Sequence, residues 1–279
     1  MRKKDKTAET LSLSLDGAGP KEIAGAAIAE FSPKKIFVGF SGGFDSLVAA
    51  HWCMNSIPGC EVFHIDTGIG VKATRDYVEQ ICRDNGWPLT VIRAKEDCGQ
   101  DYDEIVKEFG FPGPAGHTMM FTRLKERATE KLLRDNKAVR ADNVMLITGI
   151  RQDESARRSK YQSSTISFRG NLLWVSAFYY RSIDWFGAYV KEHSLKRNPV
   201  SEMLGMSGEC LCGAFAHAGE KALIKMVCPE THARIEALEA EVVANGHSWG
   251  WEESPPKKRA DEKTDDMFNV FPMCAGCGK

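Results

Sequence analysis

The strongest constraint on the fold is a regular alternation of short apolar runs with longer segments of helical character. The runs are rich in β-branched, aromatic and aliphatic residues, as buried strands are, and occupy residues 35–40, 61–66, 89–92 and 144–149. Helical segments occupy residues 47–54, 74–85 and 122–136. Parallel strands need crossover connections, so this alternation predicts an α/β fold with a doubly wound parallel sheet. Ligands of such sheets bind beyond the carboxyl ends of the strands.

The chain divides into three predicted regions. Residues 1–18 are polar and lack periodicity, which predicts a flexible N-terminal tail. Residues 19–197 form the α/β domain, which begins with an Ala-rich helix over 21–31. Residues 198–279 form a small Cys-rich C-terminal appendage with a helix over 230–244, supported by a bound metal.

Composition excludes several classes of protein. The chain has 279 residues, 43% of them hydrophobic and 27% charged, with a formal net charge of −1, which is typical of a globular protein. No apolar run approaches the roughly 20 residues that cross a bilayer, so we expect a cytoplasmic protein without a membrane partner. The near-neutral charge argues against bulk electrostatic attraction to nucleic acid, while a local basic groove stays open.

A Gly-rich loop joins the first predicted strand to the following helix. It consists of Ser41-Gly42-Gly43-Phe44-Asp45-Ser46. Backbone N–H groups and the helix dipole converge there on an anion, two glycines allow close approach, and two serines add hydroxyl donors. The loop has neither the Gly-Lys-Ser/Thr ending of a Walker A motif nor the Gly-x-Gly-x-x-Gly spacing of a dinucleotide site. The alternative is a turn that only joins strand to helix.

Asp45 is the exceptional residue of this loop. A carboxylate beside a phosphate repels it unless a cation intervenes, so Asp45 is predicted to bind Mg²⁺ or to support it.

Two further strand ends carry candidate ligand-binding residues. Asp66, Thr67 and Gly68 close the second strand, with a plain turn capped by the aspartate as the alternative. Gly149, Arg151 and Arg157 follow a later strand, where arginine can hold phosphate through two parallel hydrogen bonds. The alternative for the arginines is a solvated, salt-bridged helix face.

These motifs, in this order, resemble the phosphoadenosine phosphosulfate reductase family within the ATP pyrophosphatase superfamily. The resemblance rests on the phosphate loop, on His64-Ile65-Asp66-Thr67-Gly68, on Thr148-Gly149-Ile150-Arg151, and on Ile183-Asp184-Trp185 leading to Asn198-Pro199. It covers roughly residues 35–215. It implies ATP as ligand, cleaved between the α and β phosphates, and Arg123 and Lys125 as additional cationic contacts. On residue type alone, these two are ordinary surface charges.

The chain departs from true sulfonucleotide reductases in two places. Met119-Met120 stand where some of those enzymes have adjacent cysteines for an iron–sulfur cluster. The Glu-Cys-Gly-Leu-His tail with its nucleophilic cysteine is replaced by Cys274-Ala275-Gly276-Cys277. The resemblance therefore extends to the nucleotide site more securely than to the reductase reaction.

Two close pairs of cysteines predict a metal site. Cys210 and Cys212 form one pair, Cys274 and Cys277 the other, and Cys228 is a spare candidate. Four thiolates suit Zn²⁺ or an iron–sulfur cluster, and spacing does not separate the two. The family resemblance favours a [4Fe-4S] cluster over Zn²⁺. The other cysteines, Cys53, Cys60, Cys82 and Cys98, are expected to act as small buried hydrophobic residues.

The leading hypothesis is an ATP-dependent adenylating enzyme of sulfurtransferase type. Asp45, Arg151 and Arg157 would be its catalytic residues, and the acceptor would be a nucleic acid or a small molecule. A sulfur-donor protein and a second copy of the chain are further candidate partners. One alternative is a sulfonucleotide reductase that uses Cys274 and Cys277 as nucleophile and resolving thiol. Another is a non-catalytic nucleotide-binding module with a zinc docking element.

Overall fold

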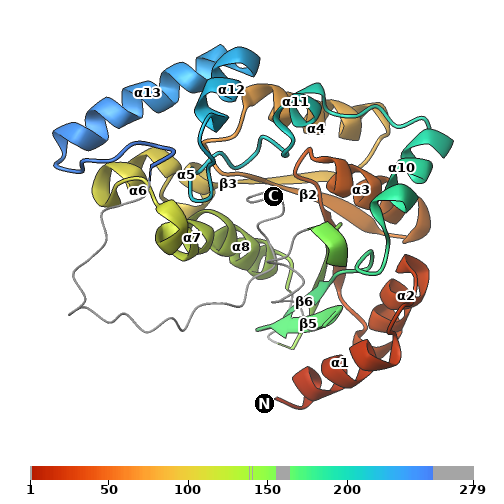
Figure 1. The fold of residues 1–279 in the computed structure, drawn as a ribbon. Helices are drawn as coiled ribbons and strands as arrows, with labels where there is room; N and C mark the ends of the chain where they lie inside the picture. The colour runs from red at the N-terminus through yellow and green to blue at the C-terminus, as the bar shows by residue number, and fades with distance from the viewer. Residues whose placement is uncertain (1, 138, 140, 155–163, 254–279) are drawn as a thin grey trace.

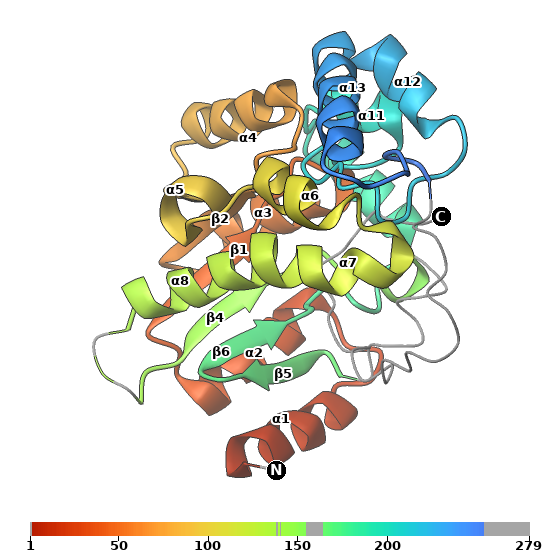
Figure 2. The same ribbon diagram turned by 90° about the vertical axis from the view of Figure 1, so that its left-hand side faces the viewer.

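A computed structural model describes residues 2–137, 139, 141–154 and 164–253, and it confirms the predicted α/β class. Within these residues one sheet has six strands in the order β3-β2-β1-β4-β6-β5 (Figures 1 and 2). Every neighbouring pair is parallel except β5 and β6, which run antiparallel. The bounds are β1 Lys35–Gly39, β2 Cys60–Asp66, β3 Leu89–Arg93, β4 Val144–Ile147, β5 Ile166–Arg169 and β6 Leu172–Val175.

Alternation of side chains along the strands gives each face of the sheet its own apolar core. Ile36 and Val38 of β1 face α2 (Pro20–Phe31), α3 (Phe44–Ser56) and α4 (Lys72–Asp84). Phe37 faces the opposite layer, where α8 (Arg127–Asp135) contributes Ala128 and Leu132. The period of two residues in a strand produces this division.

A third apolar cluster shows how the C-terminal region, predicted to lack an independent core, packs on the rest of the chain. It joins residues between 69 and 124 to residues between 200 and 251, with Trp251 only 1% exposed. The elements around it are α5 (Ala94–Cys98), α6 (Tyr102–Phe109), α7 (Gly113–Phe121), α11 (Pro199–Leu204), α12 (Glu220–Val227) and α13 (Pro229–Ala244). The described part of residues 198–279 thus shares its core with the nucleotide-binding region.

The N-terminus also differs from its expectation. Residues 3–14 form helix α1 (Lys3–Ser14), which packs along β5 and is not a flexible tail. The Ser12 side chain is buried and its hydroxyl accepts a hydrogen bond from the Ile166 N–H at 3.0 Å. Lys4 donates to Asn171 at 2.9 Å, and Leu11 and Leu15 pack on the core. The two hydrogen bonds are with residues more than 150 positions away, so the local polarity of residues 1–18 could not predict them.

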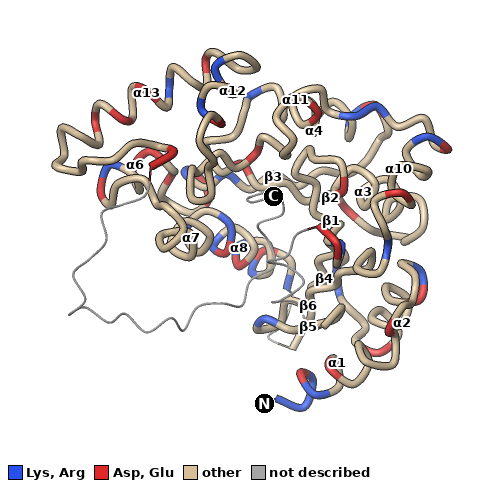
Figure 3. The backbone as a smooth tube through the Cα atoms, in the orientation of Figure 1, with Lys and Arg blue, Asp and Glu red and all other residues tan. Residues whose placement is uncertain are grey.

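The predicted helix over 122–136 is the second half of a longer helical run. α7 continues through a π-helical turn at Thr122–Glu126 into α8. α10 (Ile183–Glu192) lies beside α3 on the other face of the sheet (Figure 1). No described helix has the length and apolar character needed to cross a membrane. In the view of Figure 3, acidic and basic residues are interspersed along the chain.

Candidate functional site

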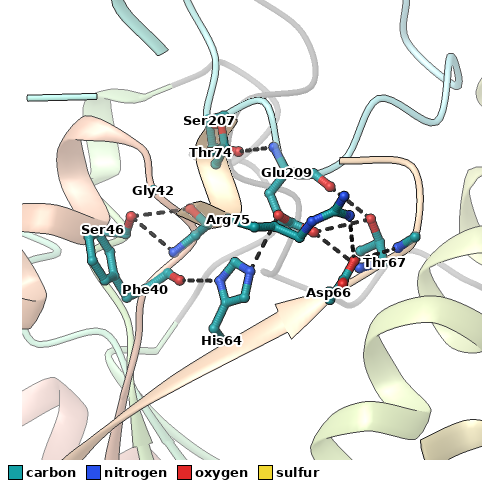
Figure 4. Close-up of polar contacts among 12 residues, drawn as sticks. Phe40, Gly42, Ser46, His64, Asp66, Thr67, Thr74, Arg75, Ser207 and Glu209 are labelled. Atoms are coloured by element: carbon teal, nitrogen blue, oxygen red, sulfur yellow. Dashed lines mark hydrogen bonds and ion pairs between the residues drawn. The ribbon is translucent and has the colours of Figure 1, made fainter. Parts of the chain in front are cut away.

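The phosphate loop, residues 41–46, lies between β1 and α3 as predicted. Gly43 is the N-cap of α3, which begins at Phe44. The Ser46 hydroxyl accepts a hydrogen bond from the Ser41 N–H at 3.2 Å and donates to the Gly43 carbonyl at 2.9 Å (Figure 4). The hydroxyls of Ser41 and Ser46 are 3.1 Å apart. The loop is therefore closed by its own serines at the N-terminus of a 13-residue helix, where the dipole favours an anion.

Gly42 has a backbone conformation that requires glycine. Its φ is +79°, and a Cβ built on it would lie 2.6 Å from Cγ2 of Thr74. Its carbonyl accepts a hydrogen bond from the Asn198 side-chain amide at 3.1 Å. Asn198 also donates to the Thr74 hydroxyl at 3.1 Å and accepts from the Val200 N–H at the start of α11. The Asn198-Pro199 motif thus holds the phosphate loop from outside.

Asp45 and Arg151 face each other across the carboxyl ends of β1 and β4. Nε of Arg151 lies 3.2 Å from Oδ1 of Asp45, and NH1 of Arg151 pairs with Asp153. The Arg151 side chain is only 8% exposed, and its guanidinium lies 5.4 Å from the centre of the Phe186 ring. The structure therefore places a buried cation against the carboxylate that was predicted to bind Mg²⁺.

Gly149 allows this approach of the two strand ends. A Cβ on Gly149 would lie 2.5 Å from the carbonyl oxygen of Asp45 and 3.2 Å from Cβ of Ala49. Any larger residue would displace the first turn of α3.

Asp66, Thr67 and Gly68 end β2 beside the same loop. Oδ1 of Asp66 accepts hydrogen bonds from the Gly68 N–H at 2.9 Å and from NH1 of Arg75 at 2.8 Å. The first of these bonds is the aspartate-capped turn that was the alternative interpretation. The Gly68 carbonyl also accepts a hydrogen bond from Arg234 of α13.

The sequence analysis gave no role of their own to two functional candidates, Glu209 and His64. Glu209 is 4% exposed, and its carboxylate accepts a hydrogen bond from the Thr67 N–H at 3.1 Å. His64, 3% exposed, donates through Nδ1 to the Phe40 carbonyl at 2.7 Å, because a carbonyl can only accept. Nε2 of His64 lies 3.4 Å from Oε2 of Glu209 (Figure 4).

The environment of His64 changes its pKa in two opposite ways. Burial lowers the pKa, while the Glu209 carboxylate, the Phe40 carbonyl and Asp66 raise it, and the net shift is upward. His64 was quoted only as part of the Asp66-Thr67-Gly68 motif. Glu209 is a glutamate next to Cys210, and nothing in the sequence around it indicates that its side chain is buried. It could therefore not be recognised as a candidate site residue from the sequence.

None of the contacts described for Arg123 is with the phosphate loop. Arg123 donates to Gln100 at 2.9 Å, lies 3.9 Å from the Glu108 carboxylate and stacks 4.5 Å from the Phe109 ring centre. Lys125 lies in the π-helical turn, and Arg157 lies outside the described residues. Such π-helical turns often occur at functional sites.

The predicted metal site is described only in part. Cys210 is half-buried and Cys212 is buried, and the Cys212 carbonyl accepts a hydrogen bond from Tyr102 at 3.0 Å. Cys228 is buried at the N-terminus of α13, whereas Cys274 and Cys277 lie outside the described residues. Among the residues that are described, no three or more His, Cys, Asp or Glu side chains form a group that could hold a metal. The cluster or zinc ion stays a prediction.

Comparisons with known proteins agree with this architecture. Residues 35–201 match the phosphoadenosine phosphosulfate reductase domain. The crystal structure of phosphoadenylyl-sulfate (PAPS) reductase from Candida auris, in complex with phosphate, superposes with a TM-score of 0.54 at 16% identity. The match covers 72% of this chain and 93% of that one. This likeness shows a shared fold.

A curated relative matches a smaller part of the chain. A probable sulfurtransferase of Methanocaldococcus jannaschii is 34% identical over 80 residues, which cover 26% of this chain and 24% of the relative. The chain therefore spans about a quarter of the length of that protein.

An NH3-dependent NAD synthetase from Campylobacter jejuni matches with a TM-score of 0.44 at 14% identity, over 89% of this chain and 98% of that one.

The family match covers more than half of the chain and includes the phosphate loop, Asp66-Thr67-Gly68, Gly149, Arg151 and Asn198. With a mostly parallel sheet and these motifs at the carboxyl ends of its strands, the chain belongs to the phosphoadenosine phosphosulfate reductase domain family, within the ATP pyrophosphatase superfamily.

Proposed function

We propose that this chain is an ATP-dependent adenylating enzyme that cleaves ATP to AMP and pyrophosphate. The observation that carries the proposal is the phosphate loop at the N-terminus of α3, closed by Ser41 and Ser46 and faced by the buried Arg151. An anion-binding helix terminus with a fixed arginine beside it suits the charge of a transferring phosphate.

In the proposed reaction an oxygen of the acceptor attacks the α-phosphorus. The new O–P bond forms as the bond from the α-phosphorus to the bridging oxygen breaks, and pyrophosphate leaves with that electron pair. In this proposal the N–H groups of Gly42 and Gly43 and the Arg151 guanidinium would neutralise the growing charge. The catalytic contribution of the protein is then mainly position and charge.

Asp45 is the described side chain that fits Mg²⁺ at this site. Mg²⁺ is commonly held by one or two carboxylates together with substrate phosphates, so a single aspartate beside a triphosphate is sufficient. The ion would supply charge neutralisation at the phosphate oxygens. In the structure, Arg151 supplies the positive charge beside Asp45, because its Nε lies 3.2 Å from the Asp45 carboxylate.

The finer part of the proposal is sulfur transfer to the activated acceptor. Two observations favour it: the similarity to a probable sulfurtransferase, and the position of Cys210 next to Glu209, whose carboxylate contacts Thr67. A sulfur nucleophile would displace AMP from the acceptor. The acceptor class proposed is a nucleic acid or a small molecule with a nucleophilic oxygen.

The test is anaerobic purification of the full chain followed by a pyrophosphate assay with ATP·Mg²⁺ and tRNA, DNA or small-molecule acceptors. Acceptor-dependent release of pyrophosphate and AMP without free phosphate supports the proposal. Asp45→Asn and Arg151→Gln should each reduce this turnover at least about 100-fold, the scale of losing one charge-stabilising group. Asn55→Ala, an exposed change at the far end of α3, is the matched control.

Other outcomes distinguish the rival functions. Release of sulfite from a sulfonucleotide with a thioredoxin-like donor would identify a reductase. ATP binding without turnover for every acceptor would identify a nucleotide-binding module. Iron and sulfide, or zinc, measured in the same preparation would decide the nature of the predicted metal site.

A further inference from the structure

Glu209 connects the loop that carries Cys210 and Cys212 to the nucleotide site. We call residues 207–212 the cysteine loop. The Glu209 carboxylate accepts the Thr67 N–H at 3.1 Å, while the Glu209 carbonyl accepts the Thr67 hydroxyl at 2.7 Å. A Cβ on Gly70 would lie 2.7 Å from that carbonyl and 2.8 Å from the carboxylate, so the loop packs tightly on the chain after β2.

The second oxygen of this carboxylate faces His64 inside the protein. Oε2 of Glu209 and Nε2 of His64 lie 3.4 Å apart, and both side chains are at least 95% buried. Neither atom makes a hydrogen bond within the described residues. Because Nδ1 of His64 is committed to the Phe40 carbonyl, a proton gained or lost by the ring is at Nε2. The charge of His64 therefore decides whether this contact attracts.

His64 in turn forms a hydrogen bond with the residue that precedes the phosphate loop. The Phe40 carbonyl that it holds belongs to the residue just before Ser41. The charged groups that act on His64 are Glu209 on the cysteine loop and Asp66 on β2. Arg75 of α4 neutralises Asp66 through a 2.8 Å contact. Glu209 is thus the carboxylate that directly faces Nε2.

We propose that Glu209 is a positioning residue that couples the cysteine loop to the nucleotide site through Thr67 and His64, with the charge of His64 setting the strength of the coupling. When Nε2 is protonated, the buried ion pair holds the cysteine loop, Thr67 and the base of the phosphate loop in one arrangement. When Nε2 loses its proton, its lone pair faces a carboxylate and the contact weakens. The effect on nucleotide affinity rests on the proposed ATP-binding function.

Glu209→Gln separates charge from shape. A glutamine can still accept the Thr67 N–H, and its NH₂ can donate to the neutral Nε2, so the contact no longer depends on the charge of His64. Glu236→Gln is the matched control, because Glu236 also faces a histidine, His232, at 3.3 Å, yet is 56% exposed and lies on α13.

The experiment uses the full chain and two readouts. The first is NMR titration of the histidine ring signals, seven in all, with His64 assigned by its loss in His64→Gln. The second is the Kd for ATP·Mg²⁺ by calorimetry between about pH 6 and 9, a window that brackets ordinary and raised histidine pKa values.

In the wild type we expect ATP affinity to fall about fivefold as the pH rises through the His64 pKa, the effect of a coupling near 1 kcal/mol. Glu209→Gln should lower the His64 pKa by about one unit or more and flatten the pH profile of affinity. Glu236→Gln should change neither.

An unchanged His64 pKa in Glu209→Gln would overturn the proposal, as would a lowered pKa with a wild-type pH profile. If Glu209→Gln does not fold, Glu209→Asp gives the same decision, because its shorter side chain cannot reach Thr67 and His64 together. Absence of ATP binding by the wild type at every pH overturns the proposed function instead, while the His64 titration still decides the ionic contact.

Discussion

The hydrogen bonds of Asn198 lead to a prediction that can be worked through from the structure. Asn198→Ala removes three bonds: one to the Gly42 carbonyl, one to the Thr74 hydroxyl, and the cap on the Val200 N–H. The two donated bonds contribute about 1 kcal/mol each and the cap about 1 kcal/mol. We expect the free energy of unfolding to fall by about 3 kcal/mol.

A second variant keeps the bond from Asn198 to the phosphate loop and removes the bonds of Thr74, so comparison of the two variants isolates the effect of the loop bond. Thr74→Val keeps the shape of the side chain and removes its hydroxyl, which accepts from Asn198 and donates to the Ser207 carbonyl at 3.1 Å. It should cost about 2 kcal/mol of stability but leaves the bond from Asn198 to Gly42 in place. Only Asn198→Ala frees the loop, so only it should weaken ATP binding, by about fivefold to tenfold for 1 to 1.4 kcal/mol.

Urea unfolding and calorimetric titration with ATP·Mg²⁺ test both numbers. Asn55→Ala, which loses only an exposed bond to the His51 carbonyl, controls for the loss of an asparagine. If Thr74→Val weakens ATP binding as much as Asn198→Ala, general destabilisation explains the effect. If Asn198→Ala binds ATP as tightly as the wild type, the loop does not depend on Asn198, and the reasoning fails.

Three further predictions follow from other contacts. Gly149→Ala should cost about 1–3 kcal/mol of stability by urea unfolding, because its Cβ would meet the Asp45 carbonyl at 2.5 Å; Gly187→Ala, which meets nothing within 4 Å, should cost nothing. The pKa of His64 is raised in the folded state, so its contribution to the unfolding free energy is complete below the ordinary value of 6.5 and is lost as the pH rises through the folded pKa. Urea titrations across that range should show the loss in the wild type, and an equal loss in Glu209→Gln would contradict it. Ser12→Ala should lower stability by about 1 kcal/mol and speed proteolysis within α1, since the hydroxyl anchors that helix to β5.

The sequence predicted those parts of the fold that depend on local pattern. Four strands and the helices over 47–54, 74–85 and 122–136 were recognisable because apolar runs and Gly-rich turns carry their own signal. β5 and β6 were not predicted: Ser167 and Arg169 interrupt the apolar pattern of β5, while the short apolar run of β6 was overlooked. α1 was missed because its polar residues hide a packing face that only β5 reveals.

The site was predictable to a similar extent and for a similar reason. Strand ends in a parallel sheet converge, so the phosphate loop, Asp66 and Arg151 could be expected together. The contact of Thr67 with Glu209 spans 142 positions and that of Gly42 with Asn198 spans 156. No spacing rule reaches so far. The pairing of Asp45 with Arg151 was also not foreseen, because each residue was considered at its own strand end.

The long-range contacts also bear on which chemistry the chain can perform. A separate appendage could move its cysteines toward or away from the nucleotide. Here the cysteine loop packs against Thr67 through Glu209, and Leu211 accepts a hydrogen bond from the buried Trp251 at 2.7 Å. Cys210 is therefore held one residue from a side chain that contacts the Asp66-Thr67-Gly68 turn. In the proposed sulfur transfer, the cysteine loop would therefore need no domain movement to stay beside the Asp66-Thr67-Gly68 turn.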